Sequence, residues 1–297
     1  MVRYPSLLAN LFSSTFIKQV INNEHQLYFH GILRQTNFEK ELKKSIPLGS
    51  ALHEVFNFLN ENYRCEYVFK TAILNELLLK RHDLIESAYL TEFRAFNAKA
   101  DIIILNGTST VYEIKSDIDN FARLLNQVSI YQKMFDRVYV VSNSKNLLTV
   151  KKIIPKGVGI AVLNDDLTID FKRESASHIK QLDQSYMFDS LRKPEYLSMI
   201  KAAFGEVPKV AGTLIHARCK KLFCTLDPKK AHSYFLQVLK SRKFNDTQIE
   251  LIHNVNLGLK GLVSDKYYSE KECKRISFAL NQKITQNVSP LHPSKAV

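Results

Sequence analysis

The sequence has no hydrophobic run of the length that a membrane-spanning helix requires. Although 45% of its 297 residues are hydrophobic, no apolar stretch approaches the roughly 20 residues of such a helix. The first residues, MVRYPSLLANLFSSTF, interrupt their apolar stretches with Pro, Asn and Ser and so do not form the core of a signal peptide. These absences predict a soluble protein that stays in the cytoplasm and has no membrane partner.

Cysteine is scarce, and no sequence repeat of fixed period is evident. Four cysteines are too few for a disulfide framework in a chain of this size. Cys219 and Cys224 follow His216, but no second pair of ligands follows at the spacing of a zinc site. The charged fraction of 24% is that of an ordinary globular protein. The chain is therefore expected to fold around apolar cores, and its length allows about two domains.

Positive charge is in excess and unevenly distributed along the chain. The formal net charge is +13, and residues 1–175 carry 22 Lys and Arg against 19 Asp and Glu, whereas residues 176–297 carry 20 against 10. Such an excess favours polyanionic partners through counterion release, so the C-terminal part is expected to bind nucleic acid. A solubilising surface is the alternative. The first candidates for phosphate contacts are two pairs of lysines, Lys220 with Lys221 and Lys229 with Lys230.

The periodicity of the sequence changes near residue 82. Residues 5–82 have helical periodicity. Six short stretches rich in β-branched or aromatic residues are then expected to form strands: 90–96, 100–105, 110–115, 137–142, 158–163 and 167–171. Helices are expected at 119–135, where Asp117 or Asp119 can cap the first turn, at 147–154, and in short pieces after residue 176. This order predicts an α/β fold with a mixed sheet flanked by helices.

One segment, KADIIILNGTSTVYEIKSD (residues 99–117), combines an acidic residue on one expected strand with Glu-x-Lys on the next. Side chains two positions apart in a strand share a face, so Glu113 and Lys115 project the same way, about 6.6 Å apart. Charge inside an apolar strand is costly unless it is paired or binds a metal. Asp101, Glu113 and Lys115 are therefore candidates for a functional site, although a bare Glu-x-Lys triplet also occurs as a solvent-facing pair.

These three residues fit the requirements of phosphodiester hydrolysis. The reaction needs oxygen ligands for Mg²⁺, or for Mn²⁺ in its place, and a water activated beside the metal. It also needs positive charge where negative charge accumulates in the transition state. Asp101 and Glu113 can supply the ligands, and Lys115 can orient or activate the water and neutralise the developing charge.

With its surroundings, the motif resembles the PD-(D/E)XK nuclease superfamily, in which a helix-strand-strand-strand-helix-strand core carries a metal-binding Asp and a Glu-x-Lys. LTEFRAFNAKADIIILNGTSTVYEIKSDIDNFARLLNQVSIYQ is similar to an uncharacterised bacterial family of that superfamily, although Ala100 stands where Pro is usual. The resemblance implies that Asp101 and Glu113 bind the metal and that Lys115 serves in water activation. It also implies three consecutive segments: an N-terminal helical segment (1–60), the nuclease core (61–175) and a basic helical C-terminal region (176–297).

The same resemblance suggests further acidic residues. Many relatives need a Glu from the helix that precedes the sheet, and Glu66 is the first candidate, since it shares a helical stripe with Lys70 that is expected to pack against the sheet. Glu76 is its rival. Glu92, on the first strand beside Arg94, is a third acid near the expected site, with an ordinary exposed strand residue as the alternative interpretation.

The helix after the motif contributes a Gln-x-x-x-Tyr pattern. Gln127 and Tyr131 lie four residues apart at the edge of the apolar face, and Arg123 lies one turn earlier. This pattern resembles one that borders the active site in recombination-repair exonucleases of the superfamily. Tyr131 is equally compatible with a purely packing role.

The chemistry also predicts the register of the hairpin at Asn106-Gly107. A two-residue turn with uninterrupted pairing would place Asp101 opposite Tyr112 and turn it away from Glu113. A shared metal site therefore requires one extra residue in the connection or a bulge, since a shift of one residue moves the side chain to the other face. The simplest solution is a three-residue loop, 105–107, with its glycine in the left-handed region.

The sequence thus predicts a Mg²⁺-dependent deoxyribonuclease. The main alternative is a non-catalytic nucleic-acid-binding or adaptor protein that retains the nuclease fold, and a basic scaffold protein is a third reading. The joint presence of Asp101, Glu113 and Lys115 favours the enzyme, because a binding protein has no need of all three. The family resemblance implies products with a 5′-phosphate and a 3′-hydroxyl.

Overall fold

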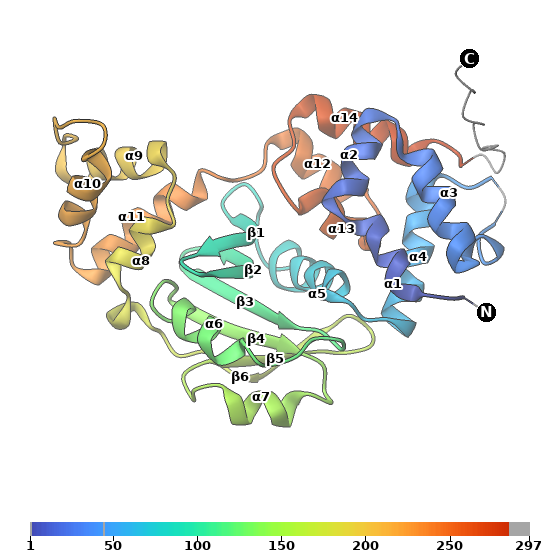
Figure 1. Ribbon diagram of the computed structural model, residues 1–297, viewed down its shortest axis with the longest axis horizontal. Coiled ribbons are helices and arrows are strands. Elements are labelled where there is room, and N and C mark those ends of the chain that lie inside the picture. The colour runs from blue at the N-terminus through green and yellow to red at the C-terminus, as the bar shows by residue number, and fades with distance from the viewer. Residues whose placement is uncertain (1, 44, 285–297) are drawn as a thin grey trace, which may run out of the picture. The chain divides into compact units, whose positions relative to one another are not determined.

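The computed structural model describes residues 2–43 and 45–284, which form two compact units (Figure 1). Among the described residues, one unit combines residues up to 71 with residues 245–284 and is helical. The other unit, residues 72–244, contains the whole sheet. No helix among the described residues is long and apolar enough to cross a membrane.

The helical unit is built from helices of both ends of the chain. Its N-terminal helices are α1 (Pro5–Ala9), α2 (Ser14–Asn22), α3 (His25–Thr36), α4 (Leu48–Asn62) and the first part of α5 (Glu66–Ile73), with short 3-10 turns at Asn10–Phe12 and Phe38–Lys40. Its C-terminal helices are α12 (Asp246–Asn254), α13 (Leu257–Ser264) and α14 (Glu270–Asn281). Helix α14 packs on α2 and α4, and α13 packs on α4. At the α13–α4 contact, a Cβ on Gly258 would lie 2.6 Å from the Phe56 ring, so glycine allows the close approach.

The sheet unit contains six strands in sequence order, β1 to β6. They are β1 (Ala88–Ala95), β2 (Ala98–Leu105), β3 (Ser109–Lys115), β4 (Arg137–Ser142), β5 (Gly159–Leu163) and β6 (Ile169–Arg173). Strands β1 to β3 are antiparallel, β3 to β5 are parallel, and β6 is again antiparallel to β5. The parallel connections run through α6 (Leu124–Tyr131) and α7 (Leu147–Ile153), as parallel pairing requires.

One apolar core joins a face of the sheet to these helices and to the helices that follow the sheet. The latter are the 3-10 turn Ile179–Gln181, α8 (Gln184–Asp189), α9 (Lys193–Phe204), α10 (Ile215–Phe223) and α11 (Pro228–Lys240). Val128 of α6, Val140 of β4 and Phe235 of α11 all belong to this core and are fully buried. The opposite face carries a ladder of rings in which Tyr112 stacks on Tyr139, with centroids 5.5 Å apart.

The expected α/β fold with a mixed sheet flanked by helices is confirmed, and each predicted strand is present within two residues. The helix after β3 is shorter than predicted, because it begins at Leu124 instead of Asp119. Neither predicted cap is used: the Asp119 carboxylate accepts hydrogen bonds from Ser116, and Asp117 accepts one from Asn143. Leu125, an apolar residue of that helix, is 53% exposed.

The division of the chain differs from the three consecutive segments predicted. Helices α8 to α11 join the sheet unit, whereas α12 to α14 join the N-terminal helices. Backbone hydrogen bonds tie the end of the described chain to the start of α4, since Leu48 N–H donates to the Gln282 carbonyl (2.9 Å) and Ile284 N–H to the Ile46 carbonyl (3.0 Å). The basic region 176–297 is therefore not one structural unit.

Candidate active site

The β2–β3 hairpin places Asp101 on the same side as Glu113. Leu105 pairs with Ser109 across a three-residue loop, Asn106–Thr108, and Gly107 has a φ of 106°. The predicted loop length and the glycine conformation are confirmed, but the loop lies one residue further along than predicted. Compared with uninterrupted pairing around a two-residue turn, the register is shifted by one residue, so Asp101 is aligned with Glu113 just beyond the last pair, Ile102 with Tyr112.

The three acidic strand residues form a row across β1, β2 and β3. The β1–β2 register runs from Thr91↔Ile102 to Phe93↔Ala100, so Glu92 lies opposite Asp101. One carboxylate oxygen of Glu92 and one of Asp101 are within 4.8 Å of each other. Glu92 has a φ of 53°, which is unusual for a residue other than glycine and marks a local distortion of β1 at this point.

The alternation of apolar side chains changes at this row. In β1, Leu90 and then Phe93 belong to the core on one face of the sheet, and in β2, Ala100 and then Ile103 do so. Each strand skips two residues there, Thr91 with Glu92 in β1 and Asp101 with Ile102 in β2, and each pair includes an acidic residue. Glu92 and Asp101 therefore lie where the regular alternation is interrupted, as happens at a β-bulge.

Strands β2 and β3 separate beyond this point, and Asp101 takes over the hydrogen bonding. Regular pairing ends at Ile102↔Tyr112. Just beyond this pair, the backbone N–H of Ile114 in β3 donates to the Asp101 side chain, at 2.7 Å from Oδ2. The Asp101 side chain thus takes the place of a backbone carbonyl of β2 as acceptor. This hydrogen bond fixes the position of the Asp101 carboxylate where β2 and β3 separate.

Glu113 and Lys115 are buried charges that are paired with each other and with α6. Lys115 Nζ donates to Glu113 Oε1 at 2.6 Å and to Gln127 Oε1 at 3.2 Å. Tyr131 donates to the other Glu113 oxygen, Oε2, at 2.9 Å. Glu113 is 1% exposed and Lys115 is 8% exposed, so these partners compensate for the loss of hydration.

Helix α6 therefore contributes to the site as predicted, because its Gln-x-x-x-Tyr pair contacts the Glu-x-Lys pair. Burial, followed by the nearby Glu113 carboxylate, raises the pKa of Tyr131 above its ordinary value of 10.0, and Asp101 adds to the shift. Tyr131 consequently remains a hydrogen-bond donor at all physiological pH values.

A polar cavity of about 610 Å³ opens over these residues. Asp101, Lys115 and Gln127 line it, as does the predicted Arg94. The remaining charged residues of its wall are Lys99, Asp119 and Arg123. Lys99 forms an ion pair with Glu92. Positively charged side chains of the cavity wall therefore lie beside the row of acidic residues.

Lys99 and Asp119 are site residues that the sequence reasoning missed as such. Lys99 stands two positions before Asp101, and since residues two apart share a strand face, this spacing was an available signal. Asp119 was interpreted as a helix cap, whereas it closes the turn after β3 by accepting from Ser116. Arg123, predicted one turn before Gln127, lines the cavity as the residue preceding α6.

Glu66 and Glu76 remain predictions from the sequence. Glu66 is the first residue of α5, and its carboxylate pairs with Lys70 at 2.6 Å. Glu76 lies in the π-helical continuation Leu74–Leu79, where it pairs with Lys80 at 2.6 Å and accepts from Asn75 at 3.0 Å. Each of these ion pairs joins residues four apart on a helix, a common surface arrangement.

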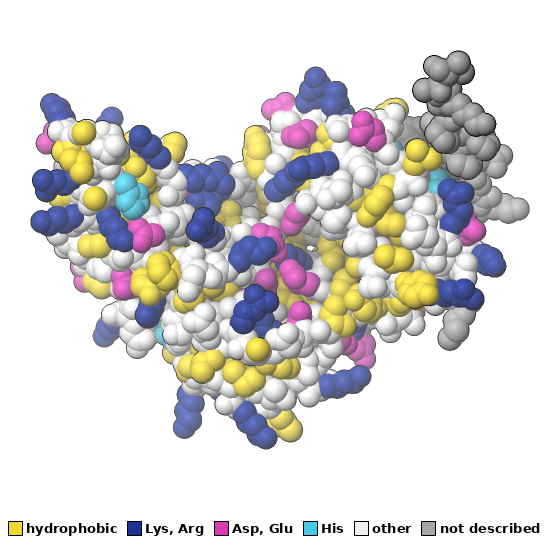
Figure 2. All heavy atoms as spheres, in the orientation of Figure 1, with side chains coloured by type: hydrophobic (Ala, Val, Ile, Leu, Met, Phe, Trp, Pro, Cys, Tyr) yellow, Lys and Arg dark blue, Asp and Glu magenta, His cyan; other side chains and the backbone are white. Residues whose placement is uncertain are grey.

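The predicted nucleic-acid-binding lysines lie on α10 and α11, where Lys and Arg side chains are numerous on the surface (Figure 2). Lys221 is exposed, as are Lys229 and Lys230 in the first turn of α11. Lys220 is partly neutralised, since it pairs with Asp189 at 2.6 Å. The four lysines are therefore unequal candidates for phosphate contacts.

The donor set suits a hard divalent cation. Glu92 and Asp101 offer carboxylate oxygens within 4.8 Å of each other, and carboxylate oxygens are the ligands that Mg²⁺ prefers. Asp101 lines the open cavity, so a cation held there would keep room for water. Lys115 also lines that cavity, within reach of a phosphate group bound in it.

Comparison with known proteins gives one family. A family model described as "Bacteriophage P4 protein cII" matches residues 59–262. The chain is 25% identical over 186 residues to "Protein cII" of Enterobacteria phage P4, and this match covers 60% of the chain and 67% of that protein. No solved structure matches significantly. The matched residues include every candidate position from Glu66 to Lys230.

Proposed function

The chain belongs to the Bacteriophage P4 protein cII family, and we propose that it is a metal-dependent nuclease that hydrolyses phosphodiester bonds in DNA. The observation that carries the proposal is the register that sets Asp101 opposite Glu113, beside the buried Lys115. We propose further that the sheet unit is a PD-(D/E)XK core. The helix before the sheet, the three antiparallel strands, α6 and β4 occur in the order that this core requires.

The chain's own residues can perform each task of the hydrolysis. Bound Mg²⁺ or Mn²⁺ would polarise the scissile phosphate and lower the pKa of a coordinated water. Asp101 and Glu113 would hold the cation, with Glu92 as a further ligand. Tyr131 and Lys115 keep the Glu113 carboxylate oriented through its two oxygens.

Lys115 has two tasks in this proposal. Its ammonium orients the attacking water and neutralises charge as the phosphorus becomes five-coordinate. The water oxygen forms the new bond to phosphorus while the bond to the 3′ oxygen breaks, so the products are a 5′-phosphate and a 3′-hydroxyl. Arg94 and Arg123, on the cavity wall, are placed to bind the neighbouring phosphates.

The proposal is tested by incubating the purified chain with linear duplex, circular and single-stranded DNA, in Mg²⁺, Mn²⁺ or chelator. We expect cleavage in either metal and none in chelator, and nicked circles would identify an endonuclease. An RNA substrate in parallel tests the preference for DNA. Binding of all substrates without cleavage in any metal would contradict the proposal and favour a non-catalytic binding protein.

A further inference from the structure

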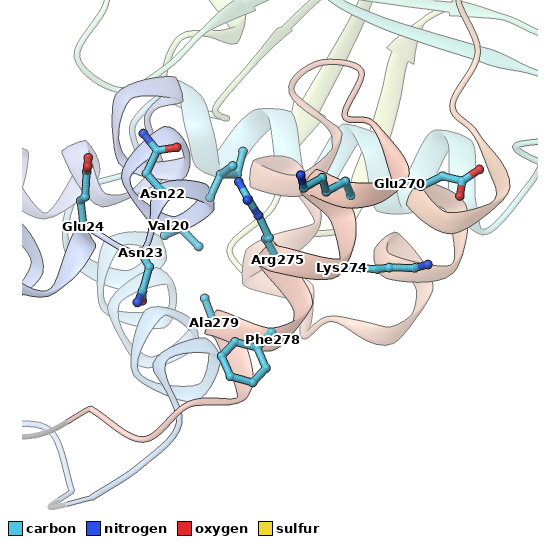
Figure 3. A pocket seen from close by; sticks show the side chains of 11 residues that line it. Val20, Asn22, Asn23, Glu24, Glu270, Lys274, Arg275, Phe278 and Ala279 are labelled. Atoms are coloured by element: carbon cyan, nitrogen blue, oxygen red, sulfur yellow. The ribbon is translucent and has the colours of Figure 1, made fainter.

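The helical unit has a groove of about 890 Å³ between α2 and α14 (Figure 3). Its floor is apolar, because Val20, Ile21 and Ala279 are buried there. One wall is the exposed face of α14, and the other is the end of α2 with the exposed amides of Asn22 and Asn23. The groove belongs entirely to the helical unit and is separate from the cavity in the sheet unit.

Three cations stand on the α14 wall. Lys271, Lys274 and Arg275 are three and four residues apart, so they share one face of the helix, and all three are exposed. None of them forms an ion pair or a side-chain hydrogen bond with another described residue. The nearby Glu272 carboxylate does not pair with Arg275. It accepts hydrogen bonds from the backbone N–H and the hydroxyl of Ser269 in the helix cap.

The acidic residues of the groove do not neutralise this wall. The groove also contains Glu24 and Glu270, and Figure 3 shows them at opposite ends of the view, with Arg275 and Phe278 between them. The middle of the groove is therefore positively charged. Glu270 precedes Lys274 by four residues and shares its helix face, but the three cations that α14 contributes to the groove outnumber this one carboxylate.

An exposed aromatic ring completes the arrangement. Phe278 is 68% exposed although it follows Arg275 by three residues on the same helix face. From Lys271 to Phe278 the helix advances about 10 Å. Alternation of phosphate-binding cations with a free aromatic face is the arrangement by which proteins hold single-stranded nucleic acid, since the backbone follows the charge while a base stacks on the ring.

We propose that the α2–α14 groove binds a single strand of nucleic acid. Lys271, Lys274 and Arg275 contact its phosphates, and one unpaired base stacks on Phe278. A base within a duplex is already stacked and cannot cover the ring, so the groove selects unpaired strands. The inference goes beyond the proposed function, because it holds whether or not the sheet unit cleaves DNA.

The chain has no tryptophan, which permits a local test. The Phe278→Trp variant of the full chain gives one fluorophore at the stacking position. It is titrated with an unlabelled oligothymidylate in chelator, so that no turnover occurs. We expect saturable quenching, which a matched duplex produces only weakly. In the same background, Lys274→Ala with Arg275→Ala should raise Kd and reduce the magnitude of the salt slope by about 1.4, or about 0.7 per lost phosphate contact.

Two controls make the result specific to the groove. Tyr267→Trp places the fluorophore at a 60% exposed position of the same unit outside the groove, and it should not be quenched. Lys18→Ala with Lys40→Ala removes the same charge from exposed positions outside the groove and should leave Kd nearly unchanged.

Three results would each overturn the inference. They are no quenching of the Phe278→Trp fluorescence by the oligonucleotide, equal quenching by duplex, or an equal loss of affinity in both pairs of charge substitutions. Displacement of the oligonucleotide by polyglutamate at equal charge concentration would also overturn it, in favour of an acidic peptide. All variants change exposed side chains, and circular dichroism verifies their folding. Cleavage is measured separately, so failure here leaves the nuclease proposal intact.

Discussion

Glu113 and Lys115 show how a charged pair is maintained inside an apolar sheet. Every residue of β3 is buried, yet these two carry full charges. Their mutual contact at 2.6 Å is supplemented by two partners from α6, because Tyr131 donates to Glu113 and Lys115 donates to Gln127. Replacing such a pair by apolar residues often does not reduce stability, which indicates that the pair serves a purpose other than folding.

The first prediction concerns the three central residues. Asp101→Asn, Glu113→Gln and Lys115→Ala should each lower turnover at least about a hundredfold, or roughly 2.7 kcal/mol in the barrier. In the proposal the two carboxylates hold the cation, and Lys115 is the ammonium that contacts Glu113. Cleavage rates at saturating Mg²⁺ are the measurement. Asp170→Asn, at a half-exposed carboxylate on β6, is the matched control and should cleave normally.

A second prediction concerns Tyr131 as a positioning residue. Its hydroxyl donates to Glu113 Oε2 at 2.9 Å and lies 3.0 Å from the Lys99 carbonyl. Tyr131→Phe keeps the ring in the core and removes only these contacts, so Glu113 loses its orientation. We expect the Mg²⁺ concentration for half-maximal cleavage to rise about tenfold, with a smaller effect on the rate at saturating metal.

The control for Tyr131 is Tyr267→Phe, which removes a phenolic hydroxyl from an exposed side chain. A lower saturating rate with an unchanged metal requirement in Tyr131→Phe would contradict the positioning role and point to direct contact with substrate. Loss of folding is separable, because the ring that packs against Phe135 remains.

For individual residues, the sequence predicts which side chains come together better than it predicts the ion pairs that they form. Asp101, Glu113, Lys115, Gln127 and Tyr131 gather as expected, because strand and helix periodicities fix which side chains share a face. The ion pair of Lys99 with Glu92 could not be predicted. It depends on the cross-strand register and on the positive φ of Glu92, neither of which is a local property of the sequence.

Among the elements, the hairpin between β2 and β3 determines whether a common metal site exists. Its loop of three residues turns Asp101 towards Glu113, and Gly107 adopts a φ of 106°, which side chains disfavour. The Asn106 side chain lies 2.6 Å from His82 Nε2, and Thr108 donates to Asp136 at 2.7 Å. The loop is thus fixed at both ends and cannot easily change its register.

A third prediction follows for Gly107→Ala. A Cβ at this position meets no atom within 4 Å, so the cost comes from the backbone alone and should be about 1–2 kcal/mol in the free energy of unfolding. Gly31→Ala is the matched control, because Gly31 also has space but lies within α3, where alanine should stabilise by up to about 1 kcal/mol. Urea denaturation measures the change in the free energy of unfolding for both variants. Changes of the same sign in the two variants would contradict the prediction.

Element positions were predictable where periodicity was strong and less so at helix starts. The strands lie where β-branched residues cluster, because these residues pack well on a pleated surface. The start of α6 was misplaced by five residues, since Asp119 can satisfy either a helix N-terminus or a turn, and the hydrogen bonds from Ser116 decide in favour of the turn. Local sequence offers both possibilities.

At the scale of the whole molecule, the division into units could not be predicted from chain order. Helices α13 and α14 pack on α4, and α14 also packs on α2, so the ends of the chain meet through tertiary packing alone. Residues 176–297 were predicted as one basic region, yet their charge is shared between both units. The net charge therefore predicts a partner but not the surface that binds it.

The fourth prediction concerns this shared charge. Neutralising Lys221, Lys229 and Lys230 to alanine should weaken DNA binding and reduce its salt dependence, because these exposed side chains can each release counterions. Lys220→Ala should have a smaller effect, since that ammonium already pairs with Asp189. Kd measured at several salt concentrations is the test. An unchanged slope in the triple variant would return α10 and α11 to an ordinary solvated surface.

The last prediction concerns the dependence of stability on pH. His178 and His232 are almost fully buried in the sheet unit, and both are influenced by the charge of Asp136. Burial lowers the pKa of both imidazoles below the ordinary 6.5, although the Asp136 carboxylate opposes the shift. Between the lowered pKa and 6.5 the unfolded chain binds more protons than the folded one. The free energy of unfolding should therefore be highest above pH 6.5 and fall as the pH decreases below it.

Buried histidines of the helical unit act in the same direction, because burial also lowers the pKa of His25 and His30. Urea denaturation of the full chain between pH 7.5 and 5.0 measures the combined slope. His232→Gln should reduce the slope, since one site of differential proton binding disappears, while its hydrogen bond with Ser109 can be kept by the amide. His253→Gln, at an exposed position, should leave the slope as it is. Stability that stays constant or rises as the pH falls to 5.0 would contradict the prediction, because neutral buried imidazoles permit only a loss.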